Sequence, residues 1–146
     1  MTRKKWTLLV IAAAGGRPVS PVQLQKSLFL LHQNLPDRLG VDRFYDFEPY
    51  DYGPFDGDIY TDAEALQEEG LVTIDVPLGQ RYREYYATPV GLELSGTLRT
   101  KLDPAVREYL DSLVRWVRSL SFNALVQAVY SKYPEMAVNS VFRRPE

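Results

Sequence analysis

The most constraining feature of this 146-residue sequence is a pair of β-rich runs in the middle of a largely helical chain. The runs cover residues 71–76 and 81–88, and the turn Pro77-Leu78-Gly79-Gln80 separates them. Two such runs with proline and glycine between them predict a two-stranded hairpin. The chain therefore combines helices with a small antiparallel sheet, which makes it an α+β protein.

Two helices are predicted near the start of the chain. The first covers about residues 5–14 and ends at Gly15-Gly16, and its apolar residues on nearly every face predict burial on several sides. The second begins at Ser20-Pro21, an N-cap residue followed by proline at the first helical position. Its core-facing residues recur at helical spacing: Leu24, Leu28 and Leu31.

A third helix is predicted over residues 57–69, capped by Asp56 and ended by Gly70. Residues 44–50, before it, predict a short strand or an extended arm. The order helix, helix, helix, hairpin is the plan of a winged-helix domain, in which the hairpin is the wing. A generic α+β domain is the alternative.

Further helices are predicted after the hairpin. Residues 89–98 form a short helix or turn, Asp103-Pro104 begins a long helix, and residues 121–133 form the last one. We expect a single domain over residues 1–146, with a winged-helix-like core in 1–100 and a C-terminal helical extension in 101–146. The long helix carries an apolar seam, formed by Val106, Leu110, Leu113, Val117 and Leu120, with Tyr109 and Trp116 on a neighbouring stripe.

That apolar seam predicts packing against the last helix or against a second copy of the chain. The seam spans only about two heptads, too short for a coiled coil by itself. A homodimer through residues 104–133 therefore stays open as a prediction.

The residue inventory argues against catalysis and metal binding. The chain has no cysteine and one histidine, His32, which excludes thiolate metal sites and two-histidine sites. His32 has no catalytic pattern around it and is interpreted as a packing residue, and no glycine-rich phosphate loop is present. We expect a non-enzyme with no cofactor and no metal. The apolar run 8–14 is too short to span a bilayer, so a cytoplasmic protein is expected.

Charge is strongly segregated along the chain, although the formal net charge is −2. Residues 1–40 carry six basic and one acidic side chain, residues 41–79 one basic and eleven acidic, and residues 80–146 ten basic and seven acidic. The middle block contains the predicted third helix, which is the helix that a winged-helix regulator would place in a DNA groove.

The predicted third helix has no lysine or arginine. Its phosphate-repelling side chains are Asp58, Asp62, Glu64, Glu68 and Glu69. Base reading also usually needs arginine, lysine, asparagine or glutamine at the contact points. The helix is therefore predicted not to read DNA but to dock on a protein with a basic surface. The alternative interpretation is an ordinary solvated surface helix.

Aromatic residues are dense between positions 44 and 60. The default interpretation is a small secondary core beneath the third helix. Tyr52 and Phe55 are also candidate anchors for a partner, because aromatic rings suit interfaces that are partly in contact with water.

A DNA-binding regulator would instead use the basic residues of the wing and the N-terminus. This alternative set comprises Arg81, Arg83, Lys4 and Lys5. Its affinity for a duplex would fall steeply with salt.

The motif order resembles one known family. The segment 22–31, VQLQKSLFLL, resembles the second-helix signature of the SocA-like antitoxin domain, also called the Panacea domain, and the segment 50–56, YDYGPFD, resembles its tyrosine-glycine-proline turn. The resemblance covers roughly residues 5–95 and implies a non-catalytic, toxin-neutralising role, in some members by delivery to a protease. The leading hypothesis is thus a protein-binding module, antitoxin-like or an adaptor, and the alternative is a winged-helix transcriptional regulator.

Overall fold

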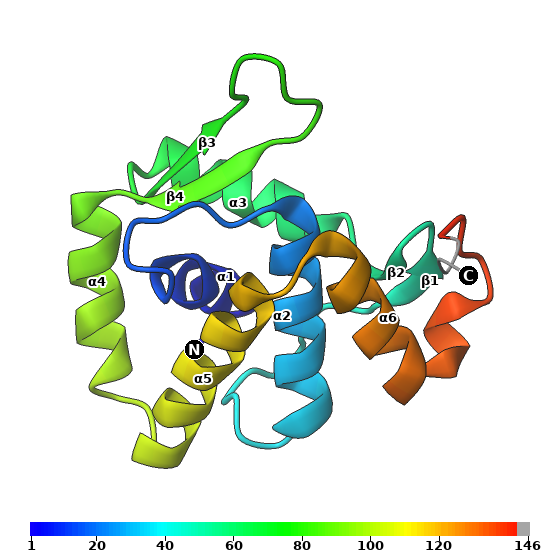
Figure 1. Ribbon diagram of the computed structural model, residues 1–146. Helices are drawn as coiled ribbons and strands as arrows, with labels where there is room; N and C mark the ends of the chain where they lie inside the picture. The colour runs from blue at the N-terminus through cyan, green and yellow to red at the C-terminus, as the bar shows by residue number, and fades with distance from the viewer. Residues whose placement is uncertain (143–146) are drawn as a thin grey trace.

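Helix α1 (Arg3–Ala12) forms the centre of the protein in the computed structural model, which describes residues 1–142 (Figure 1). Every residue from Trp6 to Ala12 is buried. Helices α2 (Pro21–Asn34), α3 (Asp58–Glu68) and α4 (Pro89–Arg99) pack against α1, as does strand β4 (Glu84–Ala87). The prediction that the first helix is buried on several sides is confirmed, because no polar face interrupts its apolar residues after Lys5.

Three of the predicted helix starts are confirmed by their caps. At α3 the N-cap is Gly57, and Asp56, the predicted cap, accepts a hydrogen bond from the Asp58 N–H at 2.9 Å. The Ser20 side chain accepts a hydrogen bond from the Gln23 N–H, and the Gln23 side chain accepts one from the Ser20 N–H, which completes a capping box. Asp103 caps α5 (Pro104–Ser119), and Ser121 caps α6 (Phe122–Lys132). These starts follow from local sequence because the cap and the first turn lie within a few residues of each other.

The predicted hairpin is present, but its strands are shorter than expected. Strand β3 (Val72–Asp75) pairs antiparallel with β4, with Val72 opposite Ala87. Residues 76–83 form a loop that stands away from the body of the protein, in place of the predicted four-residue turn (Figure 1). Pro77 has no N–H to donate, so the ladder ends before it. The confirmed class is α+β.

A third segment joins this sheet. Between α1 and α2, Val19 bridges Tyr85 of β4, and each residue's N–H donates to the other's carbonyl at 2.9 Å. The loop between the first two helices is thereby fixed to the hairpin.

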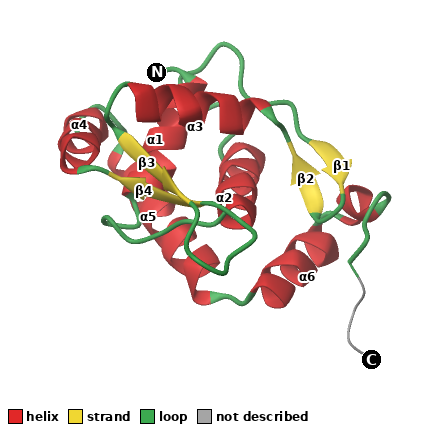
Figure 2. Ribbon diagram, turned by 90° about the horizontal axis from the view of Figure 1, so that it is seen from above, coloured by secondary structure: helices red, strands yellow, loops and turns green. Residues whose placement is uncertain are grey.

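A second, smaller hairpin lies on the other side of α2 (Figure 2). It consists of β1 (Glu48–Tyr50) and β2 (Gly53–Phe55), and β1 is the last part of the segment 44–50 in which a short strand or an extended arm was expected. The C-terminal segment, including the 3₁₀ helix η1 (Pro134–Ala137), packs against it, and the Val141 N–H donates to the Asp51 carbonyl at 2.9 Å.

The seam of α5 packs within the same chain. Val106, Leu110 and Val117 are at most 2% exposed, and the helix that α5 contacts most extensively is α2. The main partner of the seam is therefore α2, which the sequence did not indicate, while Leu113 of the seam also lines a groove with residues of α6. A homodimer through residues 104–133 would have to use the outer flanks of these helices. No helix within residues 1–142 has both the length and the apolar character to cross a bilayer.

Gly91 in α4 is packed directly on the chain that leads into β3. A Cβ at this position would lie 2.0 Å from the carbonyl oxygen of Leu71. Gly91→Ala must therefore push α4 away from the hairpin, and we expect it to lower the free energy of unfolding by roughly 1–3 kcal/mol. Denaturant unfolding measures this loss.

Gly96→Ala in the same helix is the matched control. No atom lies within 4 Å of its Cβ position, so alanine should raise the free energy of unfolding by up to about 1 kcal/mol through helix propensity. Effects of the same sign at both glycines would contradict the proposed close contact.

Candidate functional site

The acidic side chains of α3 face basic side chains from the start of α1. Nη2 of Arg3 lies 3.1 Å from Oδ2 of Asp58, and its Nε lies 3.7 Å from Oδ2 of Asp62. Nζ of Lys4 lies 2.6 Å from Oε1 of Glu69. The basic N-terminus thus neutralises one side of the acidic helix.

The hairpin adds a further ion pair, in which Nη1 of Arg83 lies 3.4 Å from Oε1 of Glu64. Among the five acidic residues of the candidate partner-binding set, Glu68 forms no ion pair within residues 1–142. The negative charge of these residues is therefore partly neutralised within the chain, although Asp58, Glu64 and Glu69 remain exposed. Two residues of the alternative DNA-binding set, Lys4 and Arg83, form these ion pairs with Glu69 and Glu64. The other two, Lys5 and Arg81, are exposed.

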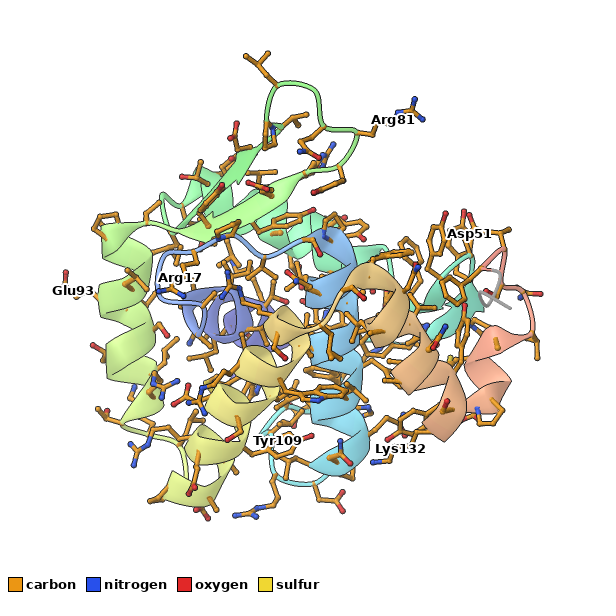
Figure 3. All side chains as sticks on the ribbon, viewed as in Figure 1. Arg17, Asp51, Arg81, Glu93, Tyr109 and Lys132 are labelled. Carbon is orange, nitrogen blue, oxygen red and sulfur yellow. The ribbon has the colours of Figure 1, made fainter. Side chains whose placement is uncertain are left out.

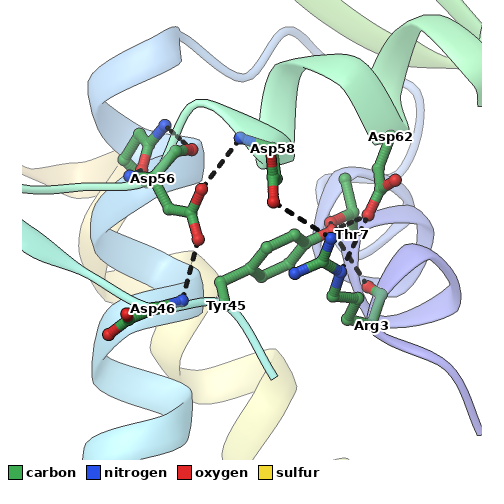
Figure 4. A network of polar contacts seen from close by, with 8 residues as sticks. Arg3, Thr7, Tyr45, Asp46, Asp56, Asp58 and Asp62 are labelled. Atoms are coloured by element: carbon green, nitrogen blue, oxygen red, sulfur yellow. Dashed lines mark hydrogen bonds and ion pairs between the residues drawn. The ribbon is translucent and has the colours of Figure 1, made fainter. Parts of the chain in front are cut away.

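Asp62 also belongs to a polar network that links α1 and α3 (Figure 4). The Tyr45 hydroxyl donates to Oδ2 of Asp62 at 2.6 Å and lies 2.7 Å from Oγ1 of Thr7. Burial and then the hydrogen bond to Asp62 raise the pKa of Tyr45 well above its ordinary value, so the hydroxyl remains a donor. Asp62 thus holds α3 against α1 and is not free to meet a partner.

We expect Asp62→Ala to lower the free energy of unfolding by about 1–3 kcal/mol, because the Tyr45 hydroxyl loses its carboxylate acceptor and Arg3 loses one of its two carboxylate partners. Glu68→Ala is the control on the same helix and should change stability by less than about 0.5 kcal/mol. Urea unfolding of both variants tests this difference. Equal losses would show that Asp62 acts only as a surface charge.

An apolar groove of about 710 Å³ lies elsewhere, where four distant parts of the chain meet. They are the start of α2, the turn between β1 and β2, the end of the loop 76–83 that leads into β4, and the start of α6. The groove is lined by residues 20–23, Tyr52, Arg81, Tyr82, Leu120, Phe122 and Leu125.

Three aromatic side chains around this groove face water. Tyr52 is 41% exposed, Tyr82 is 48% exposed and Phe122 is 44% exposed. The rings of Tyr52 and Phe122 meet edge to face, with centroids 5.0 Å apart. Large rings left half-exposed around one concavity make it a candidate binding surface.

The groove contains one residue from each of the two predicted binding sets. Tyr52 belongs to the candidate partner-binding set and Arg81 to the candidate DNA-binding set. Phe55, the other aromatic candidate, is half-buried and stacks on Tyr50 with centroids 4.8 Å apart, outside the groove. None of the acidic candidates on α3 lines the groove.

Two groove residues, Tyr82 and Phe122, were not predicted from the sequence. Tyr82 falls in what was expected to be a strand, and Phe122 lies at the start of the last predicted helix. An apolar residue at each position is ordinary by itself. These two residues can be recognised as groove residues only when the fold shows that the loop and the start of α6 line the same groove.

A smaller apolar groove, of about 430 Å³, lies between α2, α5 and α6. Trp116, Tyr109 and Lys132 line it, and Trp116 is 44% exposed. Figure 3 shows Tyr109 on α5 and Lys132 at the end of α6. This groove lies within the region of the expected homodimer, which stays a prediction.

A buried lysine lies beneath the turn that carries Tyr52. Lys26 of α2 is 3% exposed, and its Nζ lies 3.5 Å from the carbonyl oxygen of Pro54. Gly53 has φ +105°, and a Cβ there would approach this Nζ at 3.4 Å and the ring of Tyr130 at 3.2 Å. Burial lowers the pKa of Lys26 to about 7.

This burial predicts a pH dependence of stability. The folded protein releases the Lys26 proton near pH 7, whereas the unfolded chain holds it up to the ordinary lysine pKa of 10.5. Above pH 7 the unfolded chain therefore binds more protons, and the free energy of unfolding should rise with pH, by up to about 1.4 kcal/mol per pH unit. Denaturant unfolding at pH 7, 8 and 9 measures this rise.

Lys26→Met should remove the rise between pH 7 and 9 and increase stability at pH 7, because no charge is then buried. Lys5→Met, at an exposed position, should keep the slope of the unaltered protein. A slope unchanged by Lys26→Met would show that another group titrates.

The single histidine of the chain packs against an aromatic ring. His32 stacks on Phe44 with ring centroids 4.9 Å apart, and burial lowers the pKa of His32, as expected for a packing residue. In the part of the chain that the structure describes, no three histidine, aspartate or glutamate side chains gather as metal ligands. The sequence matches no protein-family model and no curated protein.

Proposed function

We propose that this chain is a non-catalytic protein-binding module that holds an apolar segment of a partner in the groove around Tyr52, Tyr82 and Phe122. One observation carries the proposal. Three rings from three distant segments, each 41–48% exposed, surround a single groove of about 710 Å³. Buried aromatic anchors supply most of the binding energy in many protein interfaces.

The chemistry of the groove suggests the kind of partner segment. Its lining is mainly apolar, and its one charged residue is Arg81. Arg81 extends from the loop at the groove edge (Figure 3). An apolar or aromatic segment with a neighbouring carboxylate would fit both features, because arginine binds carboxylates through two parallel hydrogen bonds. This partner replaces the one with a basic surface, since the acids of α3 are largely paired within the chain.

A winged-helix plan for residues 1–100 is part of the proposal. Its support is the order α1, α2, α3, β3, β4, together with the bridge from Val19 to Tyr85. On this plan the wing contributes Arg81 and Tyr82 to a protein partner instead of to a phosphate backbone. The resemblance to SocA-like antitoxins implies that the partner is a toxin.

The test is quantitative affinity capture from cells of the native host. Tyr52→Ala combined with Phe122→Ala should reduce recovery of the partner at least about tenfold, because aromatic anchors each contribute about 2 kcal/mol or more. Tyr50→Ala combined with Trp116→Ala removes two rings of similar exposure, 53% and 44%, outside the groove and should leave recovery unchanged. Thermal unfolding of each protein shows whether it remains folded.

A second variant addresses the loop alone. Arg81→Glu with Tyr82→Ala leaves the packing of α6 intact and should give the same loss of partner. Retention of the partner by both groove variants would refute the proposal. A duplex bound at low salt, and lost on Arg81→Glu with Arg83→Glu, would favour the DNA-binding regulator.

A further inference from the structure

Helix α5 exposes two chemically different flanks. One flank carries Tyr109 and Trp116, which line the smaller apolar groove. The other carries Arg115 and Arg118 and faces the loop that follows α1, where Arg17 lies (Figure 3). Arg17, Arg115 and Arg118 line one hollow of about 360 Å³, which we call the arginine hollow.

The positive charge of the arginine hollow is not neutralised by the residues around it. Its one acidic lining residue is Asp111, and both carboxylate oxygens of Asp111 accept hydrogen bonds from Arg99. Arg17, Arg115 and Arg118 form no ion pair with any residue from 1 to 142. The acids of α3, by contrast, mostly have a basic partner.

Arg118 is held in place by the backbone. Its Nε donates to the carbonyl of Pro18 at 3.1 Å, which fixes the guanidinium at the edge of the hollow. Its terminal nitrogens make no hydrogen bond with residues 1–142, so they remain donors for a ligand. Three cations around one concavity repel one another, and an anion that bridges them relieves this repulsion.

We propose that the arginine hollow binds the polyphosphate group of a small phosphorylated ligand. Arginine forks bind phosphate oxygens in pairs, which suits a ligand with several such oxygens close together. A hollow of about 360 Å³ is at the lower end of the range for small-molecule sites, roughly 300–1,000 Å³. Nucleic acid binding would require a longer row of phosphate contacts.

The test uses inorganic pyrophosphate as the probe and isothermal titration calorimetry of the full chain. The unaltered protein should bind one equivalent saturably. Arg17→Gln combined with Arg115→Gln should weaken binding at least about tenfold, because charge-assisted hydrogen bonds are lost. Arg118 is kept in this variant because it also holds the loop at Pro18.

Two further variants distinguish specific pyrophosphate binding in the arginine hollow from general attraction of an anion to a basic surface. Arg43→Gln removes an exposed arginine outside the hollow and should change the Kd less than about twofold, because screened charges act weakly at a distance. Arg115→Lys keeps the charge but not the planar fork and should weaken binding severalfold. Equal weakening by Arg43→Gln, or full affinity with Arg115→Lys, would overturn the proposal.

The remaining outcomes are equally decisive. Absence of saturable pyrophosphate binding would overturn the proposal, as would a duplex that binds through Arg17 and Arg115 while pyrophosphate does not compete. The arginine hollow shares no lining residue with the apolar groove. Tyr52→Ala combined with Phe122→Ala should therefore leave pyrophosphate binding intact, whatever happens to the protein partner.

Discussion

The rest of the fold depends on the burial of α1. A helix that is apolar on nearly every face must be enclosed, and here α2, α3, α4 and β4 enclose it. Its polar groups find partners inside: the Trp6 indole N–H donates to the carbonyl of Leu39 at 2.8 Å, and Thr7 meets Tyr45. Only the first turn of α1 reaches the surface, and it emerges beside α3. The position of α1 therefore also determines that Arg3 and Lys4 neutralise the acidic helix.

The sequence predicts the features that depend on neighbouring residues and fails for those that depend on distant ones. The starts of α2, α5 and α6 could be predicted because a capping side chain and the N–H it accepts from lie within three residues. The pairing of Arg3 with Asp58 joins residues 55 positions apart, and that of Lys4 with Glu69 joins residues 65 apart. No local pattern indicates such pairs. The sequence of this segment alone therefore predicts more free negative charge on α3 than the folded chain has.

The groove could be predicted only in part, for the same reason. The aromatic density around Tyr52 and the exposed Arg81 are visible in the sequence, but Phe122 joins them only because α6 folds back beside α2. The arginine hollow is similar, since Arg17 lies about a hundred residues before the residues of α5 that it joins. In both places exposed side chains from distant segments converge on one concavity. Such convergence supports both proposals, because neighbouring exposed groups can contact one ligand or partner together.

Contacts from two parts of the chain support the turn that carries Tyr52. Lys26 and Tyr130 lie directly beneath Gly53, and the C-terminal segment holds the turn from its other side, where the Ser140 hydroxyl and the Val141 N–H both donate to the Asp51 carbonyl. A side chain on such a supported turn has less freedom to lose when a partner binds, so more of its contact energy appears as affinity. The buried lysine is unfavourable for stability while it is charged, and a fold selected for stability alone would place an apolar residue there. Its place directly under the turn agrees with a turn shaped to present Tyr52.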